Sequence, residues 1–308
     1  MEKRQLGSSN LSISELGLGC MSLGTDEKHA RAIIEAALEE GINYFDTADL
    51  YAKGMNEVLV GQVLHSVRDK VIIATKVGNR WNENGAGWRF DSSKKYIKEA
   101  VKQSLKRLDT DYIDLYQLHG GTLSDPIDET IEAFEELQAE GFIRYYGISS
   151  IRPTVIQEYV QKSNIVSVMM QYSILDRRPE EQALPLLKKN GISIVARGPL
   201  AKGLLSEAML DKASTAVQEK GYLDYSFEDL QKVLTELKEK VAKKRSLTEI
   251  SLQYLLADSG VTSVIAGASS IQQLKENVRA IMGKGLSAEE LEMIHSLLIE
   301  NQYQEHRL

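Results

Sequence analysis

Eight short apolar runs recur along this 308-residue chain, and amphipathic helical segments fill the intervals between them. Such alternation of strand and helix is the pattern of βα units, whose strands lie parallel in one sheet. Several runs are apolar at nearly every position, as expected when helices cover one face of the sheet and packed side chains cover the other. We expect the strands to begin near Leu16, Asn43, Val71, Tyr112, Ile143, Val166, Ile192 and Val261.

Two architectures accommodate this alternation: a closed barrel and an open, doubly wound sheet. The open sheet would carry a Gly-x-Gly-x-x-Gly turn after its first strand. The sequence offers Gly17 and Gly19, but the third glycine, Gly24, comes two positions late. Eight strands without a change of composition also favour closure. The sequence therefore predicts an α/β fold, a (β/α)8 TIM barrel that forms a single domain over residues 1–308.

Polar residues at the start of helical segments predict where the helices begin. The expected caps are Asp26 for a helix that runs to Glu40, Asn56 for residues 57–67 and Ser92 for a segment that ends near Leu108.

Three further segments do not fit the simple repeat. The interval before the last strand holds two helical patterns, at about 226–244 and 248–258, and another follows the last unit at 287–300. Two helices are therefore expected in addition to the repeat. Residues 4–14 are expected to form a β-hairpin that closes the bottom of the barrel.

Composition excludes several classes of protein. The chain carries 37 Lys and Arg against 44 Asp and Glu, a net charge of −7, and its basic clusters are short, so we expect no nucleic-acid partner. No run approaches the roughly 20 apolar residues of a membrane span. The first eleven residues lack the apolar core of a secretory signal, and Cys20 is the only cysteine. A cytoplasmic location without membrane attachment is expected.

The active site of a βα barrel lies at the carboxyl ends of the strands. The second strand ends in Asp46, with Tyr51 five residues later; the third ends in Lys76 and the fourth in His119. Asp46 and Lys76 follow apolar runs, where an unpaired charge is costly, so each is a plausible partner of the other. An ammonium near a phenol stabilises the phenolate, which would help Tyr51 to give up a proton. His119 could orient a carbonyl oxygen or relay the proton.

Each of these four residues also has a purely structural interpretation. Asp46 could be a cap, Tyr51 could pack a loop, Lys76 could be a strand-end charge, and His119 could be a satisfied core histidine. Their joint position at one rim favours a proton-transfer device. The single cysteine and five scattered histidines form no metal-binding pattern, so no metal site is expected.

Two segments resemble a known family. Residues 46–57 (DTADLYAKGMNE) and 104–119 (SLKRLDTDYIDLYQLH) are similar to the aldo-keto reductase superfamily, and the likeness runs from the hairpin to Asn277. The resemblance implies that Asp46, Tyr51, Lys76 and His119 form a catalytic tetrad with Tyr51 as general acid. It also implies reduction of a small aldehyde or ketone by a nicotinamide cofactor, usually NADPH, without metal.

The resemblance further implies the residues that hold the cofactor. Those matching the nicotinamide end are Gly19, Cys20, Met21, Ser149, Ser150, Gln171 and Arg197. Those matching the pyrophosphate loop are Pro199, Leu200, Gly203 and Leu205. Those matching the adenosine end are Gly267, Ser269, Gln273, Glu276 and Asn277. A helix starting just past the last strand would also favour phosphate through its free N–H groups.

This sequence departs from the family pattern at four of these positions. Ser150 replaces a common asparagine, and Arg197 replaces a common aromatic residue, although a planar guanidinium can also stack on a ring. Ser269 and Gln273 stand where many members carry Lys or Arg toward the 2′-phosphate. NADPH is therefore expected with only a modest preference, and NADH is possible; Lys202 or Arg279 could supply a cation if the fold brings it near.

Two functions remain open at this point. One is an NADPH-dependent reductase whose specificity comes from rim loops such as residues 78–90, where Trp81, Trp88 and Phe90 could line an apolar pocket or anchor the loop. The other is a cofactor-binding regulatory protein resembling the channel β-subunits of the superfamily. Regulatory relatives often carry a long N-terminal extension, whereas here the hairpin pattern starts within the first few residues, which favours the enzyme.

Overall fold

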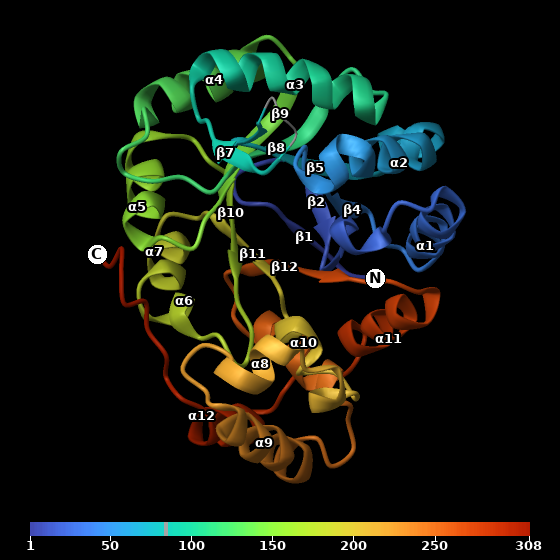
Figure 1. Cartoon of the computed structure of the whole chain (residues 1–308), viewed down its shortest axis with the longest axis vertical. Helices are drawn as coiled ribbons and strands as arrows, with labels where there is room; N and C mark the ends of the chain where they lie inside the picture. Colours follow the sequence, from blue (N-terminus) through green and yellow to red (C-terminus); the bar gives the residue numbers. More distant parts are fainter. Residues whose placement is uncertain (83–85) are drawn as a thin grey trace.

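The computed structural model describes residues 1–82 and 86–308 and shows a closed barrel of eight parallel strands (Figure 1). Around the barrel the strands follow one another in the order β10-β11-β12-β3-β4-β5-β8-β9. Their bounds are β3 Leu16–Gly19, β4 Tyr44–Asp46, β5 Ile72–Val77, β8 Ile113–His119, β9 Ile143–Ser149, β10 Ser167–Gln171, β11 Ser193–Arg197 and β12 Val261–Gly267. The predicted TIM barrel is confirmed, and each strand lies where its apolar run predicted.

Helices surround the barrel on its outer face (Figure 1). Their bounds are α1 Glu27–Glu39, α2 Met55–Leu64, α3 Lys94–Leu108, α4 Ile127–Ala139, α5 Pro153–Lys162, α6 Arg178–Glu181, α7 Ala183–Lys189, α10 Leu247–Ala257 and α11 Ile271–Ile281. Asp26 caps α1 as predicted, because its side chain accepts a hydrogen bond from the N–H of His29.

The other two predicted caps are wrong. Helix α3 is capped by Ser93, whose side chain accepts from the N–H of Tyr96, while Ser92 is buried one residue earlier. Asn56 lies inside α2, which starts after Gly54. Its buried amide donates to the carbonyl of Cys20 over 2.8 Å and accepts from the hydroxyl of Thr47 over 2.7 Å. Asn56 thus joins the loops after β3 and β4 instead of capping a helix.

The N-terminal hairpin closes the barrel from below, as expected. Strand β1 (Lys3–Gln5) pairs antiparallel with β2 (Ser12–Ser14). The neighbouring side chains of Leu6, Leu11 and Ile13 are fully or almost fully buried and belong to the apolar cluster inside the barrel. The hairpin therefore supplies the floor of the barrel core.

Several elements are added to the basic repeat. Helices α9 (Phe227–Glu236) and α12 (Ala288–Leu297) lie at the predicted additional positions, away from the barrel axis (Figure 1). A short helix, α8 (Thr215–Lys220), and a second hairpin of β6 (Asn79–Trp81) and β7 (Trp88–Phe90) were not predicted. Residues 83–85 of the expected rim loop lie outside the described residues. Within the described residues, the structure contains no helix of the length and apolarity that a membrane crossing requires.

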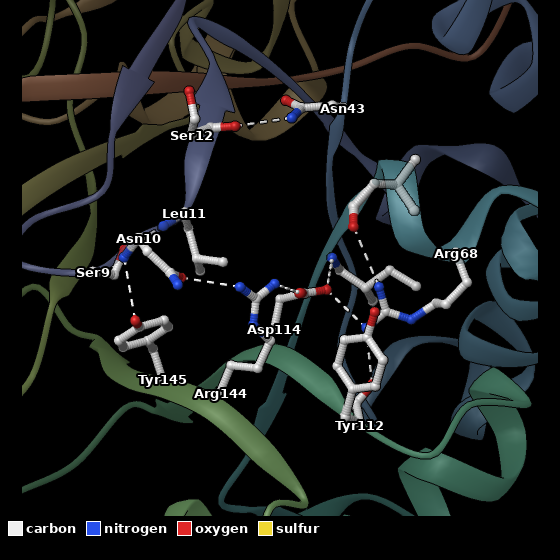
Figure 2. Close-up of polar contacts among 12 residues, drawn as sticks. Ser9, Asn10, Leu11, Ser12, Asn43, Arg68, Tyr112, Asp114, Arg144 and Tyr145 are labelled. Carbon is white, nitrogen blue, oxygen red and sulfur yellow. Dashed lines mark hydrogen bonds and ion pairs between the residues drawn. The ribbon is translucent and has the colours of Figure 1, made fainter.

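A buried carboxylate fastens the barrel near its floor (Figure 2). Asp114 of β8 is fully buried and binds Arg68 and Arg144 at 2.7 Å each. The guanidinium of Arg144 also donates to the side chain of Asn10 over 3.0 Å, and the phenol of Tyr145 accepts the N–H of Asn10 over 3.2 Å. One charge cluster therefore ties β8, β9, the segment before β5 and the hairpin together.

Replacing this carboxylate should weaken the fold. Asp114→Asn keeps the side-chain shape but leaves two arginines facing a neutral amide, which should cost about 3–5 kcal/mol of unfolding free energy. The measurement is chemical denaturation of the purified variant. Asp69→Asn, which removes the same charge from an exposed position on the adjacent turn, is the control and should unfold like the wild type. Equal stability of the two variants would contradict a stabilising role for the contacts of Asp114 with the two arginines.

Candidate active site

The period of two along a strand determines which residues line the upper rim of the barrel. Tyr44, Ala74 and Val195 face the apolar interior. Residues two positions later point the same way, so Asp46, Lys76 and Arg197 also face inward, but at the open end. The inward residues at or next to the strand ends are Gly19, Asp46, Lys76, His119, Ser149, Gln171, Arg197 and Gly267. The sequence-predicted rim residues thus form one ring.

Lys76 and Asp46 form a buried ion pair in this ring. The Lys76 ammonium lies 2.5 Å from Oδ1 of Asp46 and donates to the carbonyl of Thr47 over 2.8 Å. The side chain of Lys76 is 1% exposed and that of Asp46 is 5% exposed. The amide of Gln117 donates to the other carboxylate oxygen over 3.4 Å. The predicted pairing of Lys76 with Asp46 is therefore present.

Burial and pairing act against each other on these two groups. Burial disfavours the ammonium of Lys76, but the carboxylate of Asp46 and the phenol of Tyr51 together hold its pKa above the ordinary value. Burial raises the pKa of Asp46, and Lys76 is the main influence that opposes this rise. The ammonium is thus kept charged in a place that excludes water.

Tyr51 and His119 lie against this pair. The Lys76 ammonium is 5.2 Å from the centre of the Tyr51 ring, and the rings of Tyr51 and His119 meet edge to face at 6.1 Å. Burial, with Lys76 and Arg197 nearby, lowers the pKa of His119 to about 3. Its imidazole is therefore neutral at physiological pH. Its Nδ1 is buried and has no hydrogen-bond partner among the described residues.

A second polar network occupies the opposite side of the ring. The amide of Gln171 donates to Asp176 over 2.8 Å and to the phenol of Tyr222 over 3.3 Å, and its oxygen accepts from Arg197 over 3.3 Å. Asp176 is fully buried and accepts two hydrogen bonds of 2.7 Å from Arg178. The orientation of Gln171 is consequently held from outside the ring, which sequence reasoning did not find.

The chain ends next to this network. In Figure 1 the C-terminal tail runs along α6 and α7. Asn301 accepts from the N–H of Arg177 over 2.8 Å and donates to the carbonyl of Leu175 over 3.0 Å, and the ring of Tyr303 lies 4.8 Å from the guanidinium of Arg178. The tail thus supports the residues that hold Gln171.

The ring has a gap where a dinucleotide could cross the rim. Gly19 and Gly267 are paired at the ends of β3 and β12. A Cβ on Gly267 would displace the hydroxyl of Ser22, so the absence of a side chain leaves room for that hydroxyl beside the strand end. Two adjacent strand ends without side chains leave backbone accessible on the way from the ring to α11.

Helix α11 begins immediately beyond this gap. Its first N–H groups lack intrahelical acceptors and point toward the rim, which is where a phosphate group would be stabilised. The side chain of its N-cap, Ser270, accepts the N–H of Gln273. Ser269 donates to the amide oxygen of Gln273 from both its N–H and its hydroxyl, at 2.9 Å each. The two residues expected at the 2′-phosphate are therefore in contact with each other.

Of the two cations considered for this end, Arg279 is wrongly placed. It lies in the last turn of α11, nine residues after Ser270, about 13 Å along the helix axis. Lys202 is exposed in the turn after β11. A further titratable residue that sequence reasoning missed, His29 of α1, has its Nε2 2.9 Å from the carbonyl oxygen of Ser269.

The remaining predicted cofactor residues differ in accessibility. Cys20 and Leu205 are fully buried, so their side chains face the core and not the rim. Ser150 is buried, and its hydroxyl accepts the N–H of Arg152 over 3.2 Å. Met21 is 66% exposed. The other positions are Pro199, Leu200 and Gly203 in the turn after β11, exposed Glu276, and Asn277, which donates to the carbonyl of Gly267.

The aromatic residues of the rim hairpin have separate environments. Trp81 lines a cavity of about 460 Å³ together with polar residues of α3, and Trp88 is 52% exposed. The ring of Phe90 packs near Gly78 and Gly120. Across residues 1–82 and 86–308, no three His, Cys, Asp or Glu side chains are grouped so as to hold a metal ion.

Breaking the buried pair should destabilise the protein as well as the site. Asp46→Ala leaves the Lys76 ammonium buried without its partner, at a cost of about 3–5 kcal/mol. Chemical denaturation should therefore show an earlier midpoint for Asp46→Ala. The double variant Asp46→Ala/Lys76→Met removes both charges and should recover part of the loss. A midpoint unchanged in Asp46→Ala would mean that the pair does not stabilise the fold.

This chain is similar in sequence to known proteins of one family. A model of the Aldo/keto reductase family matches residues 15–299. The oxidoreductase YqkF of Bacillus subtilis strain 168 is 60% identical over 307 residues, with 100% of both chains covered. The NADH-specific methylglyoxal reductase of Escherichia coli strain K12 is 31% identical, and the match covers 91% of this chain and 94% of that one.

Solved structures agree with these relatives. The holo form of aldo-keto reductase AKR11C1 from Bacillus halodurans is 58% identical and superposes with a TM-score of 0.94, and the match covers 100% of both chains. The apo form of that enzyme gives 56% identity and a TM-score of 0.86, again over 100% of both chains. The family match covers nearly the whole chain, and the matches to the relatives and solved structures named here each cover 91% or more of both chains. This chain therefore belongs to the aldo-keto reductase family of oxidoreductases.

Proposed function

We propose that this protein reduces small aldehydes or ketones to alcohols with a reduced nicotinamide cofactor, and that Tyr51 is the general acid. The observation that carries the proposal is the cluster in which Tyr51 and neutral His119 lie against the buried Lys76–Asp46 pair. Family membership supports the general reaction, since aldo-keto reductases use NAD(P)H to reduce carbonyl groups.

Each residue of the cluster has a distinct chemical role in this proposal. When bound, the reduced nicotinamide supplies the hydride that reaches the carbonyl carbon. Tyr51 donates its phenolic proton to the carbonyl oxygen, and the adjacent Lys76 ammonium stabilises the phenolate that remains. Asp46 keeps the ammonium charged and in place. His119, neutral because its pKa is lowered to about 3, donates a hydrogen bond that orients the oxygen.

The rim residues provide places for the two ends of the cofactor. Gln171, held by Asp176, and Ser149 would contact the nicotinamide end, and Arg197 would offer its guanidinium plane to the ring. The N-terminus of α11 would bind phosphate.

The preference for NADPH over NADH is proposed to be modest. Ser269 and Gln273 are neutral, and a neutral hydrogen bond contributes only about 0.5–1.5 kcal/mol. Two such contacts to a 2′-phosphate correspond to a roughly tenfold to hundredfold preference, less than a paired arginine could add. The NADH-specific relative from Escherichia coli shows that this family includes members with the opposite preference.

Loss of the phenolic proton should separate catalysis from binding. In Tyr51→Phe the ring packing is retained but no acid remains, so carbonyl reduction should fall by about 10²-fold or more while cofactor affinity stays near wild type. A spectrophotometric assay with a panel of aldehydes and ketones measures the first quantity, and fluorescence titration measures the second. Wild-type protein that binds cofactor but reduces no carbonyl in the panel would favour a regulatory binding protein. Near wild-type reduction by the variant would reject Tyr51 as the acid.

Adding a cation at the adenosine end should widen the cofactor preference. We expect wild-type protein to bind NADPH about tenfold to hundredfold more tightly than NADH, and Gln273→Arg to increase that ratio through a charge-assisted contact. Gln272→Arg adds the same charge one position away, where the native amide contacts Glu276, and serves as the control. Dissociation constants come from fluorescence titration at fixed salt. Equal or tighter binding of NADH by the wild type would overturn the assignment.

A further inference from the structure

We propose that an ion pair behind the ring, between the buried Glu57 of α2 and the partly exposed Arg107 of α3, positions Tyr51 against Lys76. The inference rests on the proposed role of Tyr51 as general acid. Neither Glu57 nor Arg107 belongs to the ring described above, so both would act as positioning residues.

The turn that carries Tyr51 has an unusual backbone. The three residues after Tyr51 all adopt positive φ values, 48° for Ala52, 55° for Lys53 and 87° for Gly54. A residue with a Cβ loses about 1–2 kcal/mol in this left-handed region, and such conformations persist only where surrounding contacts impose them. Something outside the turn must therefore hold it.

Arg107 supplies that contact. A Cβ built on Gly54 would lie 2.7 Å from Cδ and 2.8 Å from Nε of Arg107, so the backbone of the turn lies directly on this side chain. Arg107 is itself fixed, because it donates to the carboxylate of Glu57 over 2.6 Å and to the hydroxyl of Ser104 over 3.2 Å. The end of the turn that carries Tyr51 thus packs against a guanidinium group that two hydrogen bonds hold in place.

The second oxygen of Glu57 reaches the strand that carries Lys76. The hydroxyl of Thr75 donates to Oε1 of Glu57 over 2.6 Å, and both residues are completely buried. Thr75 precedes Lys76 on β5, so its side chain points away from the barrel interior while that of Lys76 points into it. One carboxylate oxygen of Glu57 therefore binds β5, the strand that carries Lys76. The other oxygen binds Arg107, which in turn packs against the turn that carries Tyr51.

Asp49 is the other carboxyl group near this pair. It is buried, and burial, reinforced by Glu57, raises its pKa to about 8 although Arg107 opposes the rise. At neutral pH Asp49 is mostly protonated, and Glu57 is the carboxyl group that lies within hydrogen-bond distance of Arg107.

A shift of the turn relative to the strand would change the separation between the phenol and the ammonium. Misplacement of a catalytic group by about 1 Å can reduce a rate by about 10²-fold. Glu57 joins the two segments by hydrogen bonds of 2.6 Å to Thr75 and 2.6 Å to Arg107, and the side chain of Arg107 packs against Gly54 at the end of the turn.

The test uses two mild variants of the full-length protein. Thr75→Val removes one hydroxyl without changing shape, and Arg107→Lys keeps the charge but loses the geometry of the guanidinium. We expect kcat for carbonyl reduction to fall by about tenfold to hundredfold in both, with KM and the cofactor dissociation constant within about twofold of wild type. The solvent deuterium isotope effect on kcat should increase, because proton donation becomes slower. Lys106→Arg, an exposed change on the same turn of α3, is the control.

Amide hydrogen exchange of the cofactor-free variants gives a readout that does not depend on activity. Peptides covering residues 51–54 should exchange several times faster than in wild type, while peptides of the N-terminal hairpin should not change. Faster exchange together with a wild type that reduces no carbonyl would support the positioning contact and reject the proposed function. Unchanged exchange at residues 51–54 would overturn the inference, as would a loss of kcat matched by an equal loss of cofactor affinity and melting temperature.

Discussion

The site is organised around one ammonium group that has no access to water. Lys76 is enclosed by the barrel wall, and its charge is tolerated because the carboxylate of Asp46 and the carbonyl of Thr47 lie within hydrogen-bond distance. That requirement fixes the ends of β4 and β5 relative to each other. It also gives the phenol of Tyr51 a positive neighbour, and it adds to the burial that lowers the pKa of His119 and keeps its imidazole neutral.

Buried polar contacts also connect the barrel strands to the helices and loops around them. Inward-facing side chains at the strand ends form the ring, while the outward-facing residues between them bind buried polar groups of the helices. Thr75 contacts Glu57 in this way, and Asn56 joins the loops after β3 and β4. On the far side, Asp176 and Arg178 hold Gln171. Residues of the surrounding helices therefore make the hydrogen bonds that orient residues at the rim.

Much of the ring could be predicted from the sequence, because it depends only on local order. A residue at the end of an apolar run must lie at the rim once the barrel closes, and this placed Asp46, Lys76 and His119 correctly. Residues whose position depends on distant partners were missed. Asn56 is of a residue type that often caps helices, but its hydrogen-bond partners lie in loops up to 36 positions away. His29 contacts Ser269 across 240 positions, and no local pattern indicates that contact.

Closure of the barrel pairs two strands that the ribosome makes at very different times. Strand β3 is made near the start of the chain, yet its partner β12 comes near the end, and the hydroxyl of Ser263 bonds to the carbonyl of Ser14 across 249 positions. At about 5–20 residues per second, the ribosome needs roughly 12–50 seconds to cover that interval. Throughout that time one edge of β3 lacks its neighbour and the floor hairpin lacks the wall it closes. The nascent chain therefore spends most of its synthesis with an open sheet edge, which is the state in which this fold is most exposed to wrong pairing.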